Sequence, residues 1–162
     1  MEIKELIKDD FPELIEIYQQ GLATNIATFQ NDQPAWEEWN KGHLANCRIG
    51  IFENNIMLGW AALTPVSGRC VYAGVAELSI YIAAESRGKG IGILLMHELI
   101  VQSEAHGIWT LQSGIFAENK ISIKLHEKCG FRTVGYREKI GQKNGIWKDT
   151  VLMERRSKVV GV

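Results

Sequence analysis

The chain has 162 residues, 46% of them hydrophobic and 23% charged, with a formal net charge of −1 at pH 7. This length fits one globular domain over residues 1–162, and the composition excludes disordered, collagen-like and small disulfide-rich proteins. Because 18 basic residues nearly balance 19 acidic ones, no overall positive field favours nucleic acid as a partner.

The sequence predicts neither a membrane segment nor a metal site. Its longest apolar run, residues 91–96, is far shorter than the about 20 residues that cross a bilayer, and residues 1–5 lack the apolar core of a signal peptide. Cys47, Cys70 and Cys129 form no CxxC pair, and the histidines show no ligand spacing. We therefore expect a cytoplasmic protein with reduced cysteines, no membrane partner and no metal.

The N-terminal half predicts a strand, two helices and three further strands. Asp9 and Asp10 offer a capping carboxylate for the first helix, and Pro34 can open the second. Asn54 and Asn55 suit a tight hairpin turn because asparagine tolerates a positive φ. The expected elements are a strand over 3–7, a helix ending near Gly21, a loop over 22–33 that reaches a site, a helix over 34–44, and strands over 48–53, 56–63 and 71–82.

The C-terminal half predicts two helices and three strands. Gly107 and Gly130 can end the helices, and Asn119 can cap the second one. The expected elements are a helix over 90–107, a strand over 109–116, a helix over 119–130, and strands over 131–140 and 146–154 joined by a turn over 141–145. The order β-α-α-β-β-β-α-β-α-β-β predicts an α+β domain.

The most informative segment is a strand that begins at Glu77 and runs through a glycine-rich turn into a helix. Glycines 88, 90 and 92 let the backbone approach a ligand closely, and the unpaired N–H groups at a helix start favour an anion such as a pyrophosphate. The spacing is neither GxGxxG, because residue 93 is Ile, nor GxxxxGK[ST], because Gly90 follows Lys89. A glycine-rich turn kept only for its tight geometry is the alternative.

Arg87-Gly88-Lys89-Gly90-Ile91-Gly92 resembles the R/Q-x-x-G-x-G/A pyrophosphate loop of the GNAT superfamily of N-acetyltransferases, and the element order resembles that fold over nearly the whole chain. The resemblance implies a central mixed, mostly antiparallel sheet of about seven strands flanked by about four helices, with acetyl-CoA as co-substrate. It also implies a homodimer with residues 145–149 near the contact. Four segments narrow the resemblance to the phosphinothricin and methionine sulfoximine N-acetyltransferases: Ala27-Thr28-Phe29, Glu77-Leu-Ser-Ile-Tyr-Ile, Leu125-His126-Glu-Lys-Cys-Gly-Phe131 and Gly145-Ile-Trp-Lys-Asp149.

The resemblance also implies where the co-substrate binds. The backbone before the glycine-rich turn would bond the pantetheine arm as an added strand would, and the turn itself would hold the pyrophosphate. Asn119 has a second interpretation as a simple helix cap. The implied cofactor-binding residues are Ile80, Tyr81, Ile82, Arg87, Gly88, Lys89, Gly90, Ile91, Gly92, Ile93, Asn119 and Lys128.

Acetyl transfer to an amine requires a group that takes the amine proton and one that protonates the departing thiolate. Glu77 is the candidate base, because a carboxylate in a partly desolvated cleft can take a proton directly or through water; an ammonium anchor or a strand-surface charge are the alternatives. His126 stands where many superfamily members carry a tyrosine, and histidine is competent for proton transfer near neutral pH. Its alternative is a histidine that faces the core.

A small amino acid as acceptor would need a cation for its carboxylate and an apolar wall for its side chain. Arg69 is the candidate clamp, with an exposed surface arginine as the alternative, and Phe29 is the candidate wall. Tyr72, Lys143 and Trp147 are lesser candidates, and Trp147 could equally lie in the core or a dimer contact. The expected acceptor-binding residues are Phe29, Ser67, Gly68, Arg69, Glu77, Leu78 and Ser79.

The expected reaction is direct transfer of acetyl from acetyl-CoA to the α-amino group of a small amino acid or analogue, with no cysteine nucleophile. The resemblance implies methionine sulfoximine, phosphinothricin and methionine sulfone as acceptors. Two alternatives stay open: an acyl-CoA-binding sensor without turnover, and a protein or peptide N-acetyltransferase.

Overall fold

The computed structural model describes residues 1–162 and contains one seven-stranded sheet in the order β1-β2-β3-β4-β5-β7-β6. Neighbouring strands are antiparallel except β4 and β5, which are parallel, so the expected mixed, mostly antiparallel α+β fold is confirmed. The elements are β1 (Glu2–Glu5), η1 (Lys8–Asp10), α1 (Phe11–Leu22), α2 (Trp36–Gly42), β2 (Ile49–Glu53), β3 (Ile56–Pro65), η2 (Cys70–Tyr72), β4 (Val75–Ile82), η3 (Ala84–Ser86), α3 (Ile91–Ala105), β5 (Thr110–Phe116), α4 (Lys120–Lys128), β6 (Arg132–Lys143) and β7 (Ile146–Arg156).

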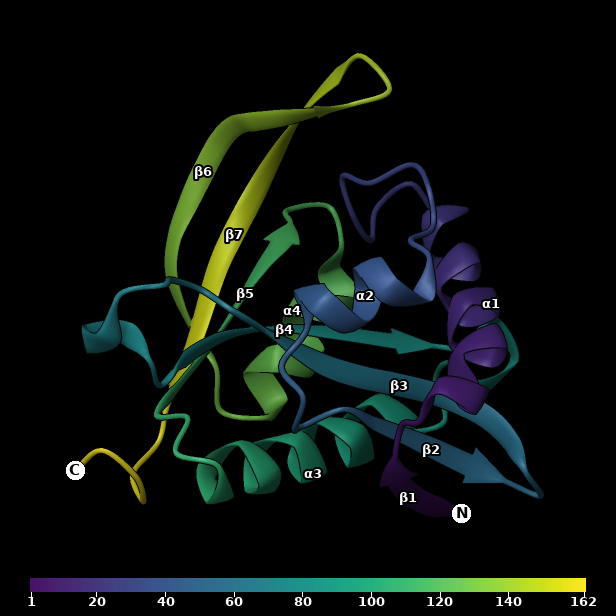
Figure 1. The fold of residues 1–162 in the computed structure, drawn as a ribbon. Coiled ribbons are helices and arrows are strands. Elements are labelled where there is room, and N and C mark those ends of the chain that lie inside the picture. Colours follow the sequence, from purple (N-terminus) through teal and green to yellow (C-terminus); the bar gives the residue numbers. More distant parts are fainter.

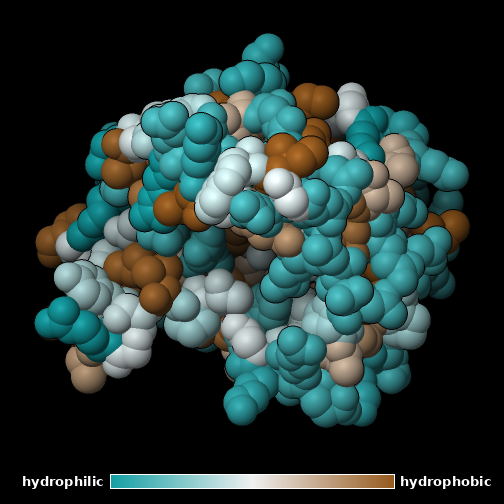
Figure 2. Space-filling model, turned by 90° about the horizontal axis from the view of Figure 1, so that it is seen from above, coloured by the Kyte–Doolittle hydropathy of each residue, from teal (hydrophilic) through white to brown (hydrophobic).

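Helices cover both faces of the sheet because its central strands are apolar on both sides. Along β3, Ala61 and Leu63 belong to the core beneath α3, whereas Trp60 and Ala62 belong to a second core beneath α1 and α2. The β6–β7 hairpin extends beyond this layered body (Figure 1). Seen from above, the molecule is hollowed near its centre, with hydrophobic and hydrophilic residues mixed around the hollow (Figure 2). None of its helices has the length and apolarity needed to span a membrane.

Three cap and turn predictions are confirmed. Asn54 and Asn55 form the β2–β3 turn with φ of 51° and 64°. Asn119 caps α4, since its side chain accepts a hydrogen bond from the Ser122 N–H at 3.2 Å. Gly107 and Gly130 follow the ends of α3 and α4 with positive φ, the conformation that favours glycine there.

Two predictions in the N-terminal half are wrong in detail. Asp10 does not cap α1, because its carboxylate accepts the Ile7 N–H at 2.9 Å within the preceding 3-10 turn. The strand predicted over 71–82 begins only at Val75. Its first residues form η2 instead, and the apolar side chains of Val71 and Tyr72 are exposed rather than paired into the sheet.

Two boundaries near the helix and the hairpin also differ from the prediction. The second helix covers Trp36–Gly42 rather than 34–44, because Ala35 before it and His43 after it are extended. The turn predicted over 141–145 shrinks to Asn144 and Gly145, which both have positive φ. Cross-strand pairing continues to Lys143 and Ile146, so the hairpin is longer than its sequence pattern predicted.

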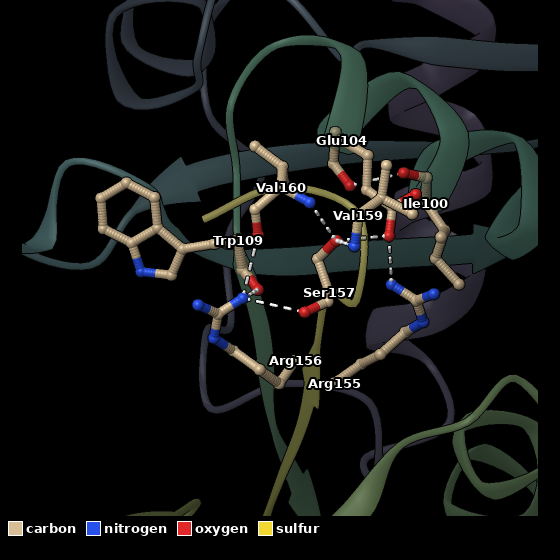
Figure 3. Close-up of polar contacts among 9 residues, drawn as sticks. Ile100, Glu104, Trp109, Arg155, Arg156, Ser157, Val159 and Val160 are labelled. Carbon is tan, nitrogen blue, oxygen red and sulfur yellow. Dashed lines mark hydrogen bonds and ion pairs between the residues drawn. The ribbon is translucent and has the colours of Figure 1, made fainter. Parts of the chain in front are cut away.

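A polar cluster ties the end of β7 to α3 and to the start of β5 (Figure 3). The Glu104 carboxylate accepts hydrogen bonds from Arg155 at 3.0 Å and from the Ser157 hydroxyl at 2.8 Å, and both bonds lower the pKa of Glu104. Arg156 donates to the carbonyl oxygens of Trp109, Ser157 and Val160. The residues after β7 are therefore folded back against the turn that leads into β5.

Candidate functional site

The site begins where β4 and β5 separate. The two strands pair only from Val75–Thr110 to Glu77–Gln112, whereas β4 stays paired with β3 as far as Ile82. The edge of β4 that faces β5 is therefore unpaired beyond Glu77, and unpaired backbone groups there are available to a ligand. A cavity of about 590 Å³ opens at this break in the sheet.

The cavity is walled by several separate elements. Residues 77–81 of β4 and 113–116 of β5 form two walls, and residues 26–30 of the loop after α1 line it as well; we call residues 26–30 the roof segment. Glu38 and Glu77 are its acidic lining residues, and no lysine or arginine lines it. With two carboxylates and no cation in its lining, the cavity favours a positively charged amine.

Glu77 is the last residue of β4 that pairs with β5, at the point where these two strands begin to diverge. Its carboxylate accepts no hydrogen bond within the protein and lies next to the backbone of β5, with Oε1 3.7 Å from the point where a Cβ on Gly114 would stand. A partly buried carboxylate without a protein donor can bind an ammonium group or accept its proton.

His126 on α4 reaches the cavity from the other side, and the residue is only 1% exposed. Its Nδ1 lies 2.7 Å from the Ser122 carbonyl oxygen. Because a carbonyl only accepts, the proton sits on Nδ1, and Nε2 carries a lone pair with no partner. Burial lowers the pKa of His126, although the Ser122 carbonyl opposes that shift. The histidine is therefore neutral near pH 7.

The glycine-rich turn lies beyond the end of β4 and leads into α3. Gly88 and Gly90 have φ of 74° and 81°. None of the N–H groups of residues 88–92 donates a hydrogen bond within the protein. Five free donors at the start of a 15-residue helix form a ready anion site. The Arg87 Nε donates to the Ile82 carbonyl at 3.2 Å and so ties this turn to the end of β4.

The structure brings most of the predicted catalytic and acceptor residues together. Asn119 also reaches the cavity, but its amide group is already engaged, because Oδ1 accepts from Ser122 and Nδ2 donates to the Ile26 carbonyl at 3.3 Å. The predicted residues that line the cavity are Phe29, Glu77, Leu78, Ser79, Ile80, Tyr81, Asn119 and His126.

The other predicted residues do not line the cavity. Arg69 is exposed in the β3–β4 connection, where its guanidinium lies 5.6 Å from the centre of the Tyr72 ring. Lys128 is exposed at the end of α4, and Trp147 is exposed on the hairpin. The predicted residues outside the lining are Ser67, Gly68, Arg69, Ile82, Arg87, Gly88, Lys89, Gly90, Ile91, Gly92, Ile93 and Lys128.

Sequence reasoning missed an aromatic wall contributed by α1, α2 and β3. Tyr18, Trp39, His43 and Trp60 all line the cavity. Trp39 of α2 and His43, which follows the end of that helix, stack with ring centroids 4.3 Å apart. Buried Arg48 fixes this end of α2 by donating to the carbonyls at its C-terminus. Aromatic residues at helical spacing are typical of any core, so the pattern alone gave no sign of a site.

Comparison with known proteins identifies the family and the fold of the chain. Residues 2–131 match the model of the acetyltransferase (GNAT) family. The phosphinothricin N-acetyltransferase of Alcaligenes faecalis is 32% identical over 154 residues, which cover 91% of this chain and 78% of that protein. The L-methionine sulfoximine/L-methionine sulfone acetyltransferase of Pseudomonas aeruginosa is 28% identical over 155 residues, 90% of this chain and 88% of that protein.

A solved structure is similar to the chain over its full fold. The crystal structure of a GNAT superfamily phosphinothricin acetyltransferase from Sinorhizobium meliloti, in complex with acetyl-CoA, superposes with a TM-score of 0.87 at 27% identity. The match covers 99% of this chain and 90% of that one.

Buried His126 and half-buried His43 make stability depend on pH. Burial lowers the pKa of both His43 and His126, so the unfolded chain takes up protons more readily than the folded one below the ordinary histidine pKa of about 6.5. We expect the melting temperature to fall as the pH drops from about 7 to 5. His126→Gln should flatten this dependence, whereas His97→Gln, on an exposed part of α3, should keep the wild-type slope. If the melting temperature of both variants depended on pH with the same slope, the dependence could not be attributed to His126.

Proposed function

The chain belongs to the acetyltransferase (GNAT) family, and from this premise we propose that it transfers the acetyl group of acetyl-CoA to the amino group of a small amino acid or amino-acid analogue. The observation that carries the proposal is the break between β4 and β5, where Glu77 and His126 line one cavity; the Glu77 carboxylate has no hydrogen-bond donor and the buried Nε2 of His126 has no partner. Acetyl-CoA and an amine can meet there without a covalent enzyme intermediate.

The residues fit acetyl-CoA as co-substrate. The free N–H groups of residues 88–92 would hold its pyrophosphate. Backbone groups alternate in direction along a strand. The Ala83 N–H, just after β4, donates to the Leu58 carbonyl of β3 at 2.9 Å, so the backbone groups of Ile80 and Ile82 point to the open edge. Because Arg87 already bonds the Ile82 carbonyl, Ile80 would bond the pantetheine amides. Tyr81 then contributes a ring to the cavity rather than backbone groups to the ligand.

The proton transfers follow from the two unpartnered groups. The amine nitrogen bonds to the thioester carbonyl carbon, the carbon–sulfur bond breaks, one proton leaves the nitrogen and the sulfur gains one. Glu77 would take the proton from the amine, directly or through water. His126 holds its proton on Nδ1 and cannot begin as an acid at Nε2. We propose that the amine proton passes from Glu77, directly or through water, to Nε2 and from Nε2 to the sulfur, which refines the expected role of a general acid and leaves Glu77 and His126 as they began.

The acceptor binds with its ammonium group toward Glu77 in this proposal. Its carboxylate would then point away from the two lining carboxylates, toward the mouth of the cavity. Arg69 lies on the connection between the two strands that carry Thr64 and Glu77, and its guanidinium makes no hydrogen bond within the protein. We propose that it moves from Tyr72 to the carboxylate when the acceptor binds.

The proposed partner is a second copy of the chain. Ile146 and Trp147, at the start of β7, are 62% and 55% exposed on the extended hairpin (Figure 1). Exposed apolar residues gathered on a projecting element are typical of an interface. A homodimer through this hairpin would bury them.

We first expect turnover in a coenzyme A release assay with methionine sulfoximine, methionine sulfone or phosphinothricin, compared with ordinary amino acids, polyamines and short peptides. Glu77→Gln and His126→Ala should each lower kcat by roughly 10²- to 10⁴-fold, the usual contribution of acid–base groups, while leaving acetyl-CoA affinity nearly unchanged. Tight acetyl-CoA binding without turnover of any amine would favour the sensor. Turnover of peptides alone would favour a protein N-acetyltransferase.

Arg69→Met tests the carboxylate clamp. We expect the KM for methionine sulfoximine to rise about 10-fold or more, since a charge-assisted bond contributes about 1.5–3 kcal/mol. The KM for the matching amine without the carboxylate should stay the same. An equal change for both acceptors would show that Arg69 does not bind the carboxylate.

If the protein forms the proposed homodimer, light scattering should give the mass of two chains. Trp147→Ser should shift the protein toward the monomer without lowering its melting temperature much, because the side chain is exposed in one copy. Tyr72→Ser, on another exposed aromatic residue, is the matched control. A wild-type monomer would reject the proposal.

A further inference from the structure

Lys143 is buried at a place where a lysine would normally be exposed. It is the last residue of β6, next to the two-residue turn of the extended hairpin, yet it is only 3% exposed. Its Nζ donates a hydrogen bond to the Gln30 carbonyl, 113 residues earlier in the chain. Burying an ammonium group is costly unless it gains a partner, so this contact defines where the hairpin tip sits.

Gly141 lies on the same face of β6 as Lys143, two residues earlier, and it also meets the roof segment. A Cβ at Gly141 would stand 3.0 Å from Cε1 of Phe29, so the strand touches the ring only because it has no side chain there. The Phe29 ring packs edge-on against Phe116 of β5 with centroids 4.5 Å apart. The inner face of the hairpin therefore fastens residues 29 and 30 over the break in the sheet.

The roof segment depends on such contacts because it has no helix or strand of its own. Tyr18 donates to Gln30 Oε1 at 2.6 Å, and Asn119 donates to the Ile26 carbonyl at 3.3 Å. Tyr18, Phe116 and Asn119 line the cavity themselves, whereas Lys143 does not. Lys143 is thus an anchor of the roof segment that can be changed without altering the cavity wall.

We propose that Lys143 is a positioning residue for the acceptor: it holds the roof segment over the cavity and thereby sets the affinity for the amine substrate. The inference rests on the proposed acetyl transfer. Without the anchor, the acceptor must order residues 26–30 as it binds, and that entropy cost reduces its affinity. Acetyl-CoA would be unaffected, because its proposed contacts are with Ile80 and residues 88–92, away from the hairpin.

The test compares Lys143→Met, Lys143→Arg and Lys139→Met in the full chain. Lys139→Met, on the same strand with an exposed side chain, is the matched control. We expect Lys143→Met to raise the KM for the acceptor about 10-fold with little change in kcat or in the KM for acetyl-CoA. Lys143→Arg keeps a donor and should recover most of the affinity, whereas Lys139→Met should behave as wild type. A parallel rise in both KM values, or none, would overturn the proposal.

A second variant and a second measurement keep the test independent of folding and of turnover. Gly141→Ala pushes against Phe29 and should raise the acceptor KM in the same selective way. Hydrogen exchange of residues 26–30 should quicken in Lys143→Met but not in Lys139→Met, even if no acceptor in the panel is turned over. Faster exchange without turnover would support Lys143 as an anchor of the roof segment and would reject the proposed acceptors. Unchanged exchange would show that Lys143 does not anchor the roof segment.

Discussion

The site depends on the early separation of β4 and β5, which leaves backbone hydrogen-bonding groups unpaired within the sheet. β4 and β5 are joined at three register positions and then diverge, which leaves one edge of β4 without partners in the middle of the sheet. Unpaired backbone in a protein interior is costly, so it persists only where the surrounding structure enforces it. Here the core beneath α3 supplies that constraint, because it joins buried residues of β2, β3 and β4 to those of β5 and β7 across the break.

The chemistry of the cavity follows from the carboxylates in its lining, which no lysine or arginine neutralises. Two carboxylates line the cavity, and its two histidines do not offset their charge near neutral pH because burial lowers the pKa of both. Such a cavity attracts an ammonium group and repels a carboxylate, so it orients a zwitterionic acceptor before any specific contact forms. In the proposed reaction, Glu77 would therefore serve twice, first orienting the acceptor by its charge and then taking its proton.

The sequence was sufficient for the fold and for the local signals of the site. The glycine-rich turn, the Asn119 cap and the order of the elements are encoded by neighbouring residues, and the structure agrees with them. The predicted cap at Asp10 failed, because that carboxylate bonds the Ile7 N–H instead. The aromatic wall and the burial of Lys143 were not predictable, because both arise from contacts between segments far apart in the chain. For Arg69, the residue type suggested a role that its position does not directly support. The sequence predicted a clamp for the acceptor carboxylate, but the structure places the guanidinium over Tyr72, outside the cavity lining.

The aromatic wall has a spectroscopic consequence. Of the five tryptophans in the chain, Trp39 and Trp60 line the cavity and pack edge to face with centroids 5.9 Å apart. Trp147, in contrast, is exposed to solvent on the hairpin, whereas Trp39 and Trp60 are buried. The intrinsic fluorescence of the protein therefore combines a component from the cavity, one from the hairpin surface and the emission of Trp36 and Trp109. A ligand in the cavity should act on the first component, and burial of the hairpin on the second.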